Sequence, residues 1–145
     1  MTRTAIYARI SADPEGRALG IARQVEDCRA LVADRLAGYE VVEVFEENDV
    51  SASTNSRKPR PRYADMLARA EAGEIEAIVA YSNSRLTRRP REVEDLIDLH
   101  NRRGVRLHTV VSGDDDLSTA DGVLMARLKA SIDAAEAERT SERAR

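Results

Sequence analysis

Several residue types are scarce in this sequence, and each shortage excludes a class of protein. The single cysteine, Cys28, excludes a disulfide framework and a cysteine-based zinc cluster, and it fits a reducing cytosol. Two histidines are too few for a histidine-rich metal site. With no tryptophan, one phenylalanine and four tyrosines, the chain lacks the material for a platform that stacks single-stranded nucleic acid. No apolar run approaches the ~20 residues that cross a membrane, and no signal-peptide pattern opens the sequence.

Lysine is scarce as well. Lys58 and Lys129 are the only lysines among 23 basic residues, and the rest are arginines. The net charge of −3 argues against a protein that binds DNA with its whole surface. The 145 residues are 42% hydrophobic, which is enough for one domain with a packed core. The positions of the arginines, rather than their number, therefore carry the functional information.

The spacing of apolar residues predicts alternating strands and helices. Because strands separated by helices need crossover connections, the predicted fold class is α/β. We expect an open, mostly parallel sheet of four or five strands, with helices on both faces and a long C-terminal helix. Polar residues predict a long loop over 46–60 and a second loop over 112–121. The predicted strands cover 4–10, 39–45, 75–81 and 105–111, and the predicted helices cover 20–36, 61–72, 90–103 and 122 to the end.

The last predicted helix changes character along its length. Its first half carries Leu124, Leu128, Ile132 and Ala135 on one face, as a helix lying on a core does. Its second half has no apolar residue larger than alanine, so we expect that half to project toward a partner or to be a cut end. We therefore expect a core over 1–121, a truncated dimerisation and DNA-contacting helix over 122–145, and a C-terminal DNA-binding region outside this sequence.

Basic residues follow two of the predicted strands. Ligands in open α/β sheets bind at the carboxyl ends of the strands, where Ala8–Ser11, Asn48–Ser51 and Ser84–Arg91 emerge. The loops after the second and third strands each hold four basic residues within seven positions. Arginine forks match phosphate oxygens, and the helix starting near Pro90 adds a favourable dipole. Ser11, amid this charge, is a candidate nucleophile on phosphorus.

Each of these residues also has a simpler interpretation. Ser11 alone more often caps a turn or helix, and Arg9 alone more often pairs with a carboxylate. Gln24 fits polar surface, and Cys28 fits the core. What favours a functional site is the convergence on one edge of Ser11, Arg9, Arg60, Arg85 and Arg88. The same crevice also fits a phosphatase or nuclease acting on a small phosphate ester, and the final helix also fits a non-catalytic interaction module.

Short motifs follow one another along the chain, from Tyr7–Ser11 through Ser84–Arg88 to Ser141–Arg143. Their residues and order resemble those of the serine recombinases, which comprise resolvases, invertases and large serine integrases. The long 49–60 loop is more similar to large integrases than to small resolvases. One departure is Ser84, which stands where the family usually has aspartate, and it leaves the general acid open. The resemblance covers almost the whole chain and rests on Tyr7–Ser11, Arg23–Gln24, Asp49–Ala52, Arg60–Pro61, Ser84–Arg88, Glu136 and Ser141–Arg143.

This resemblance implies a site-specific recombinase that cleaves and rejoins double-stranded DNA through a 5′-phosphoseryl intermediate. It implies a homodimer that becomes a tetramer in the synaptic complex, with no metal, no small-molecule cofactor and no membrane. The location is then the cytoplasm, with a bacterial or phage-encoded protein at the nucleoid. The implied catalytic residues are Ser11, Arg9, Arg85 and Arg88, the supporting residues are Gln24, Asp49, Ser51, Arg60 and Ser84, and the DNA contacts are Arg89, Glu142 and Arg143.

Overall fold

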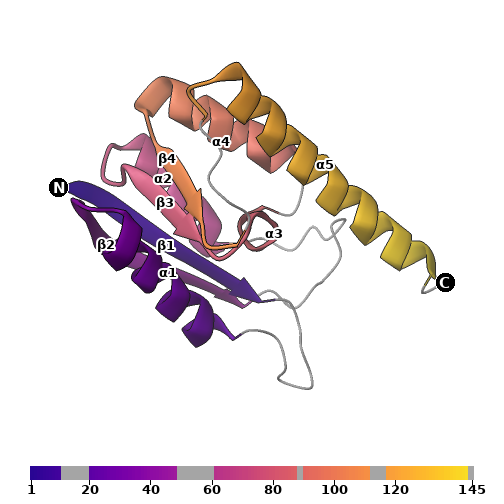
Figure 1. Cartoon of the computed structure of the whole chain (residues 1–145), viewed down its shortest axis with the longest axis horizontal. Coiled ribbons are helices and arrows are strands. Elements are labelled where there is room, and N and C mark those ends of the chain that lie inside the picture. Colours follow the sequence, from indigo (N-terminus) through magenta and orange to yellow (C-terminus); the bar gives the residue numbers. More distant parts are fainter. Residues whose placement is uncertain (11–19, 49–60, 88–89, 112–116, 144–145) are drawn as a thin grey trace.

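The structure, a computed structural model, describes residues 1–10, 20–48, 61–87, 90–111 and 117–143. Strands and helices alternate along the chain, as the apolar spacing predicts (Figure 1). Their bounds are β1 Thr2–Ile10, α1 Ile21–Arg35, β2 Tyr39–Asn48, α2 Pro61–Glu71, β3 Ala77–Ala80, α3 Asn83–Leu86, α4 Pro90–Arg103, β4 Arg106–Thr109 and α5 Ala120–Arg143.

Within the described residues, the four strands form one sheet in the order β2-β1-β3-β4, and every pair is parallel. The predicted open α/β sheet is confirmed. The chain steps from β1 to β2 in one direction, and then crosses back over β1 to reach β3 and β4. The order reverses between β1 and β3, so the carboxyl ends of these two strands form the topological switch point.

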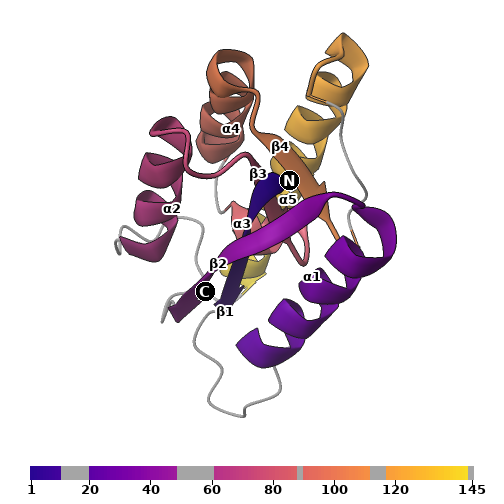
Figure 2. The same ribbon diagram turned by 90° about the vertical axis from the view of Figure 1, so that its left-hand side faces the viewer.

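Right-handed crossovers explain which helix covers which face. Because the steps from β1 to β2 and from β2 to β3 run in opposite directions, α1 lies on one face and α2 on the other (Figure 2). On the α1 face, Cys28 and Leu31 pack against Ile6 and Val79. Helices α2 and α4 share the opposite face, where Met66, Leu96 and Leu99 pack with Tyr7, Phe45 and Ile78. Helix α5 lies beside α4 and packs against it in a cluster that also includes Leu107 of β4 (Figure 2).

Helices α1, α2 and α4 stop near the glycines that the sequence marks as stop signals. Gly38, Gly73 and Gly104 have φ values of 83°, 82° and 73°. An alanine at these positions would be strained, because a Cβ atom disfavours the left-handed region. The glycines therefore fix where each helix ends and the chain turns toward the next strand.

The observed bounds differ from the predicted ones at several points. Strand β1 begins two residues earlier than predicted, and β3 and β4 are shorter than predicted. Strand β2 continues to Asn48, so the first three residues of the predicted 46–60 loop belong to the sheet. The four-residue helix α3 lies in a segment predicted as loop, since one turn is too short to show a helical period. Helix α5 begins at Ala120, two residues before the predicted start.

The orientation of α5 contradicts the prediction that its larger apolar residues lie on the core. Ala126 and Ala130 pack on α4, whereas Leu124, Leu128 and Ile132 are 55%, 47% and 54% exposed. Small side chains let the two helix backbones approach closely, and the larger residues, about half a turn away, then face outward. The buried apolar side chains of α5 are thus its alanines, and the larger apolar residues form a face that the rest of the described chain leaves exposed. No helix in the described part of the chain is long and apolar enough to span a bilayer.

Candidate active site at the carboxyl edge of the sheet

The structure describes the side chains of three predicted site residues, Arg9, Gln24 and Arg85. For three others it gives only the backbone position: Ser84 lies in α3, and Glu142 and Arg143 lie near the end of α5. The roles assigned to the remaining residues stay predictions, because Ser11, Asp49, Ser51, Arg60, Arg88 and Arg89 lie outside the described residues.

Two predicted phosphate-binding arginines meet at the topological switch point. Arg9 is the last residue but one of β1, and Arg85 lies in α3, directly after β3. The Nε atom of Arg9 donates a hydrogen bond of 3.2 Å to the main-chain oxygen of Arg85. Arg9 is buried, with 6% exposed, whereas Arg85 is partly exposed. The edge therefore holds one charge inside the fold and a second that solvent reaches.

Gln24 is not the polar surface residue of the simpler interpretation, because it is completely buried. Its Oε1 accepts a hydrogen bond of 3.2 Å from the main-chain N–H of Arg9, and its Nε2 donates one of 3.0 Å to the carbonyl of Arg9. The pairing between β1 and β3 ends at Tyr7, which lies opposite Ala80. Beyond that point the amide of Gln24 bonds the strand as a neighbouring peptide would, and so holds the end of β1 in extended form.

We expect Gln24→Glu to loosen the end of β1. A carboxylate has no donor for the carbonyl of Arg9, and burying its charge adds a further cost. The free energy of unfolding should fall by about 2–3 kcal/mol, measured by urea denaturation. Glu26→Ala, an exposed change on the same helix, is the control and should leave stability within about 0.5 kcal/mol. Equal stability of the Gln24→Glu protein would contradict this role.

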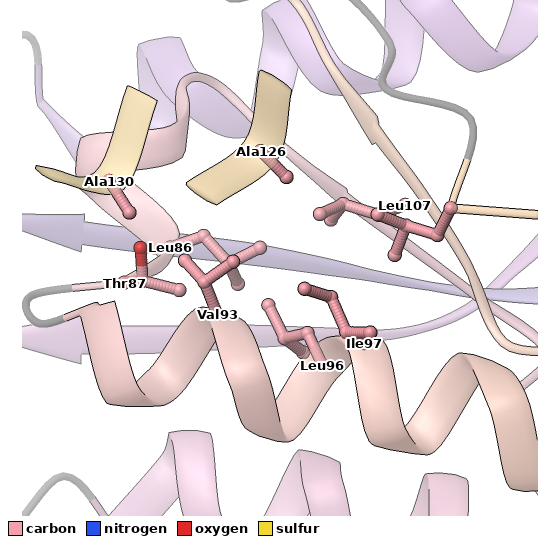
Figure 3. A pocket seen from close by; sticks show the side chains of 9 residues that line it. Leu86, Thr87, Val93, Leu96, Ile97, Leu107, Ala126 and Ala130 are labelled. Atoms are coloured by element: carbon pink, nitrogen blue, oxygen red, sulfur yellow. The ribbon is translucent and has the colours of Figure 1, made fainter. Parts of the chain in front are cut away.

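The segment that carries Arg85 is anchored at both ends. Ser82 begins α3 as an N-cap, since its Oγ accepts a hydrogen bond of 3.3 Å from the N–H of Arg85. Leu86 and Thr87 line a small apolar pocket between α4 and α5, opposite Ala126 and Ala130 (Figure 3). This anchoring holds the main chain of Arg85 against the end of β1.

Away from this edge, carboxylates neutralise many of the arginines. Arg3 pairs with Glu76 at 3.1 Å, and Arg127 pairs with Glu94 at 2.7 Å. Hydrogen bonds from Arg127 hold the pKa of Glu94 below its usual value. Arg62, one of the four basic residues counted after the second strand, pairs with Glu43 and Asp65, and its guanidinium carbon lies 4.9 Å from the centre of the Phe45 ring. Many arginines therefore take part in surface ion pairs away from the candidate site.

Cys28 is excluded as an alternative nucleophile. The thiol is buried in the α1 face of the core, as predicted, and burial raises its pKa to about 12. The reactive thiolate is therefore scarce at neutral pH. Among the described residues, no cluster of three His, Cys, Asp or Glu side chains is placed to hold a metal ion.

Sequence reasoning missed Glu47, a buried carboxylate at the carboxyl end of β2. Its register partner in β1 is Arg9. The residue was assigned to a loop, where a glutamate is unremarkable. The available signal was its position two residues after Phe45, because alternate residues of a strand share a face and Phe45 faces the core.

Comparison with known proteins identifies close matches in sequence pattern and fold. The family model described as "Resolvase, N terminal domain" matches residues 4–145. A resolvase family site-specific recombinase from Streptococcus pneumoniae has a TM-score of 0.71 and 18% identity, covering 99% of this chain and 95% of that one. The N-terminal catalytic domain of TP901-1 integrase has a TM-score of 0.67 and 20% identity, covering 94% and 98%.

A third structure is the C-terminal catalytic domain of ISC1926 TnpA, an IS607-like serine recombinase. It has a TM-score of 0.61 and 24% identity, covering 76% of this chain and 71% of that one. At these identities the structural similarities establish the fold, while the family model connects the sequence itself to a known family.

Proposed function

The chain belongs to the family of resolvase N-terminal domains and is a site-specific recombinase catalytic domain, and we propose that it cleaves and rejoins double-stranded DNA through a covalent bond between Ser11 and a 5′-phosphate. The observation that carries this proposal is the meeting of Arg9 and Arg85 at the switch point, 3.2 Å apart at their closest polar contact. Ser11 follows β1 directly in the sequence.

In the proposed reaction, the Oγ of Ser11 attacks the phosphorus of a phosphodiester. The new Oγ–P bond forms as the bond from phosphorus to the 3′-oxygen breaks, and the serine proton is transferred, in net terms, to the released 3′-hydroxyl. Rejoining reverses these steps when a 3′-hydroxyl of the recombining partner attacks the phosphoserine. The phosphoserine ester keeps the free energy of the broken bond, so the exchange uses neither ATP nor another cofactor.

The arginines stabilise charge that develops on the phosphoryl oxygens. Arg85 is partly exposed and so reaches an incoming phosphate, and Arg88 is proposed to join it as a second clamp. Arg9 acts from a buried position, where a charge is screened less than on the surface. Gln24 holds the end of β1, and Asp49, Ser51, Arg60 and Ser84 are proposed to complete the pocket.

The partners of the family are DNA and further subunits. We propose contacts to the DNA backbone from Arg89, Glu142 and Arg143, and a homodimer that pairs into a tetramer during exchange. The outward face of α5, with exposed Leu124, Leu128 and Ile132, supplies the apolar surface for such a dimer. We propose the nucleoid in the cytoplasm as the location, because double-stranded DNA is the proposed substrate.

A charge on this face is expected to break the dimer. Leu128→Glu would place a carboxylate in an apolar interface and should shift the protein to monomers, measured by sedimentation velocity. Ala64→Glu, an exposed change on α2, is the control and should leave the association unchanged. A dimer that survives both changes would place the interface elsewhere.

The proposed function is tested with the protein in its full natural chain and a plasmid carrying the genomic DNA that flanks its gene. After denaturation in detergent, we expect protein bound covalently to DNA in the wild type. Turnover of a small phosphate ester by residues 1–145 alone, without such a complex, would indicate a phosphatase or nuclease. An interaction module would show neither activity, and Arg85→Ala would change nothing.

A further inference from the structure

One buried carboxylate joins three elements beside the candidate active site. Glu47 is only 6% exposed, and its Oε1 accepts a hydrogen bond of 3.0 Å from the main-chain N–H of Tyr63. The N–H of Arg62 and the hydroxyl of Tyr7 lie 3.4 Å from its carboxylate oxygens. Burying a carboxylate is costly unless donors surround it, so this arrangement indicates a specific role.

The first role is to cap α2. This helix begins at Pro61, and the N–H groups of Arg62 and Tyr63 belong to its second and third residues. An N-cap side chain normally accepts these hydrogen bonds, but the residue before Pro61 is Arg60, whose side chain has no acceptor. Glu47 supplies the acceptor from the end of β2 instead, and a carboxylate there also interacts favourably with the positive end of the helix dipole.

The second role is to tie α2 to the strand that precedes Ser11. The hydroxyl of Tyr7 donates to the same Oε1 atom that accepts from Tyr63. The two tyrosine rings also pack edge to face, with centroids 5.5 Å apart. Tyr7 lies two residues before Arg9 on β1, so the carboxylate connects the start of α2 with the end of β1.

We infer that Glu47 is a positioning residue of the recombination site, which holds the start of α2 against the end of β1. This inference rests on the proposed function of Ser11. In this role, Glu47 acts through the oxygens that accept hydrogen bonds and through their positions. A carrier of protons would depend on the ionisable carboxyl group, and this difference separates the two roles by experiment.

The test compares Glu47→Ala and Glu47→Gln in the covalent-complex assay described above. Glu47→Ala should slow formation of the complex by about 30- to 100-fold, because a displacement near 1 Å has effects of this size. DNA binding should stay within about threefold, since the buried side chain of Glu47 presents little surface to a ligand. Glu47→Gln keeps a carbonyl acceptor for Tyr63 and Tyr7 and should recover the rate to within about fivefold of the wild type.

Met66→Ala is the matched control for lost stability. Met66 is fully buried on the same helix and belongs to the core cluster on that face of the sheet, and its truncation costs about 2–5 kcal/mol. At a temperature where all variants are folded, Met66→Ala should cleave at close to the wild-type rate. Equal slowing by Met66→Ala and Glu47→Ala would overturn the inference, and so would a Gln variant as slow as the Ala variant.

Hydrogen exchange gives a readout that does not depend on recombination. In Glu47→Ala, the amides of Arg62 and Tyr63 should lose protection while amides later in α2 keep theirs. Unchanged protection would overturn the capping role. If the wild type forms no covalent complex at all, the proposed function fails, whereas a normal wild type with an unaffected Glu47→Ala rate contradicts only the inference.

Discussion

Replacement of Ser11 by alanine is expected to abolish the covalent protein–DNA complex. Alanine has no oxygen to attack phosphorus, so the loss should exceed about 10³-fold, as it does when an enzyme loses its nucleophile. The measurement is the fraction of labelled DNA that remains attached to protein after denaturation. Binding of the uncut DNA should be retained, because one uncharged hydroxyl contributes little to phosphate contacts.

The control for this change is Cys28→Ala, which removes the one thiol of the sequence. Because the thiol is buried and its pKa is raised to about 12, we expect this variant to form the complex at close to the wild-type rate. A Ser11→Ala protein that still forms the complex would show that another residue attacks the DNA.

The second large effect is expected from Arg85→Ala. Arg85 is the partly exposed member of the arginine pair, and losing one donor to a developing oxyanion costs about 10²–10³ in rate. Cleavage should fall by this factor in single-turnover assays, while DNA affinity falls much less. Arg85→Lys should recover part of the rate, because lysine keeps the charge and loses the bidentate geometry.

Arg102→Ala is the control for Arg85→Ala. Arg102 is an exposed arginine in the last turn of α4, where Glu71 and Asp98 already bind it. Its removal should leave cleavage unchanged. Equal effects of the two substitutions would mean that overall charge, rather than the placement of Arg85, controls the rate.

The succession of strands and helices could be read from the sequence because it depends on local patterns. Apolar spacing locates α1, α2 and α4, and glycines of positive φ mark where they stop. The extension of β2 to Asn48 could not be read this way, because its last residues are polar yet still pair with β1. Tertiary contacts, which the sequence pattern does not display, decided this boundary.

The orientation of α5 could not be read from the sequence pattern either. Its large apolar residues have a helical period, so the pattern identifies a helix and an apolar face. The pattern does not say whether that face meets the core of its own chain or another surface. Packing against α4 selected the alanines, since Ala126 and Ala130 allow the closest approach of the two backbones.

For the candidate site, the sequence predicted the shared location of two arginines better than the contacts that they make. Arg9 and Arg85 were placed at one edge because parallel strands end together, and their contact bears this out. The burial of Gln24 and its bonds to the main chain of Arg9 could not be predicted, since a side-chain amide on a helix usually faces water. The ion pair of Arg62 with Glu43 was likewise not predicted, because the two residues are distant in sequence.

The most direct test of the account is mass spectrometry of the covalent complex after digestion with trypsin and nuclease. Cleavage after Arg9 and Arg17 releases a peptide of residues 10–17, in which Ser11 is the only side chain with a hydroxyl group. The account predicts a nucleotide joined to this peptide through its 5′-phosphate. A nucleotide joined through a 3′-phosphate, or found on any other peptide, would contradict it.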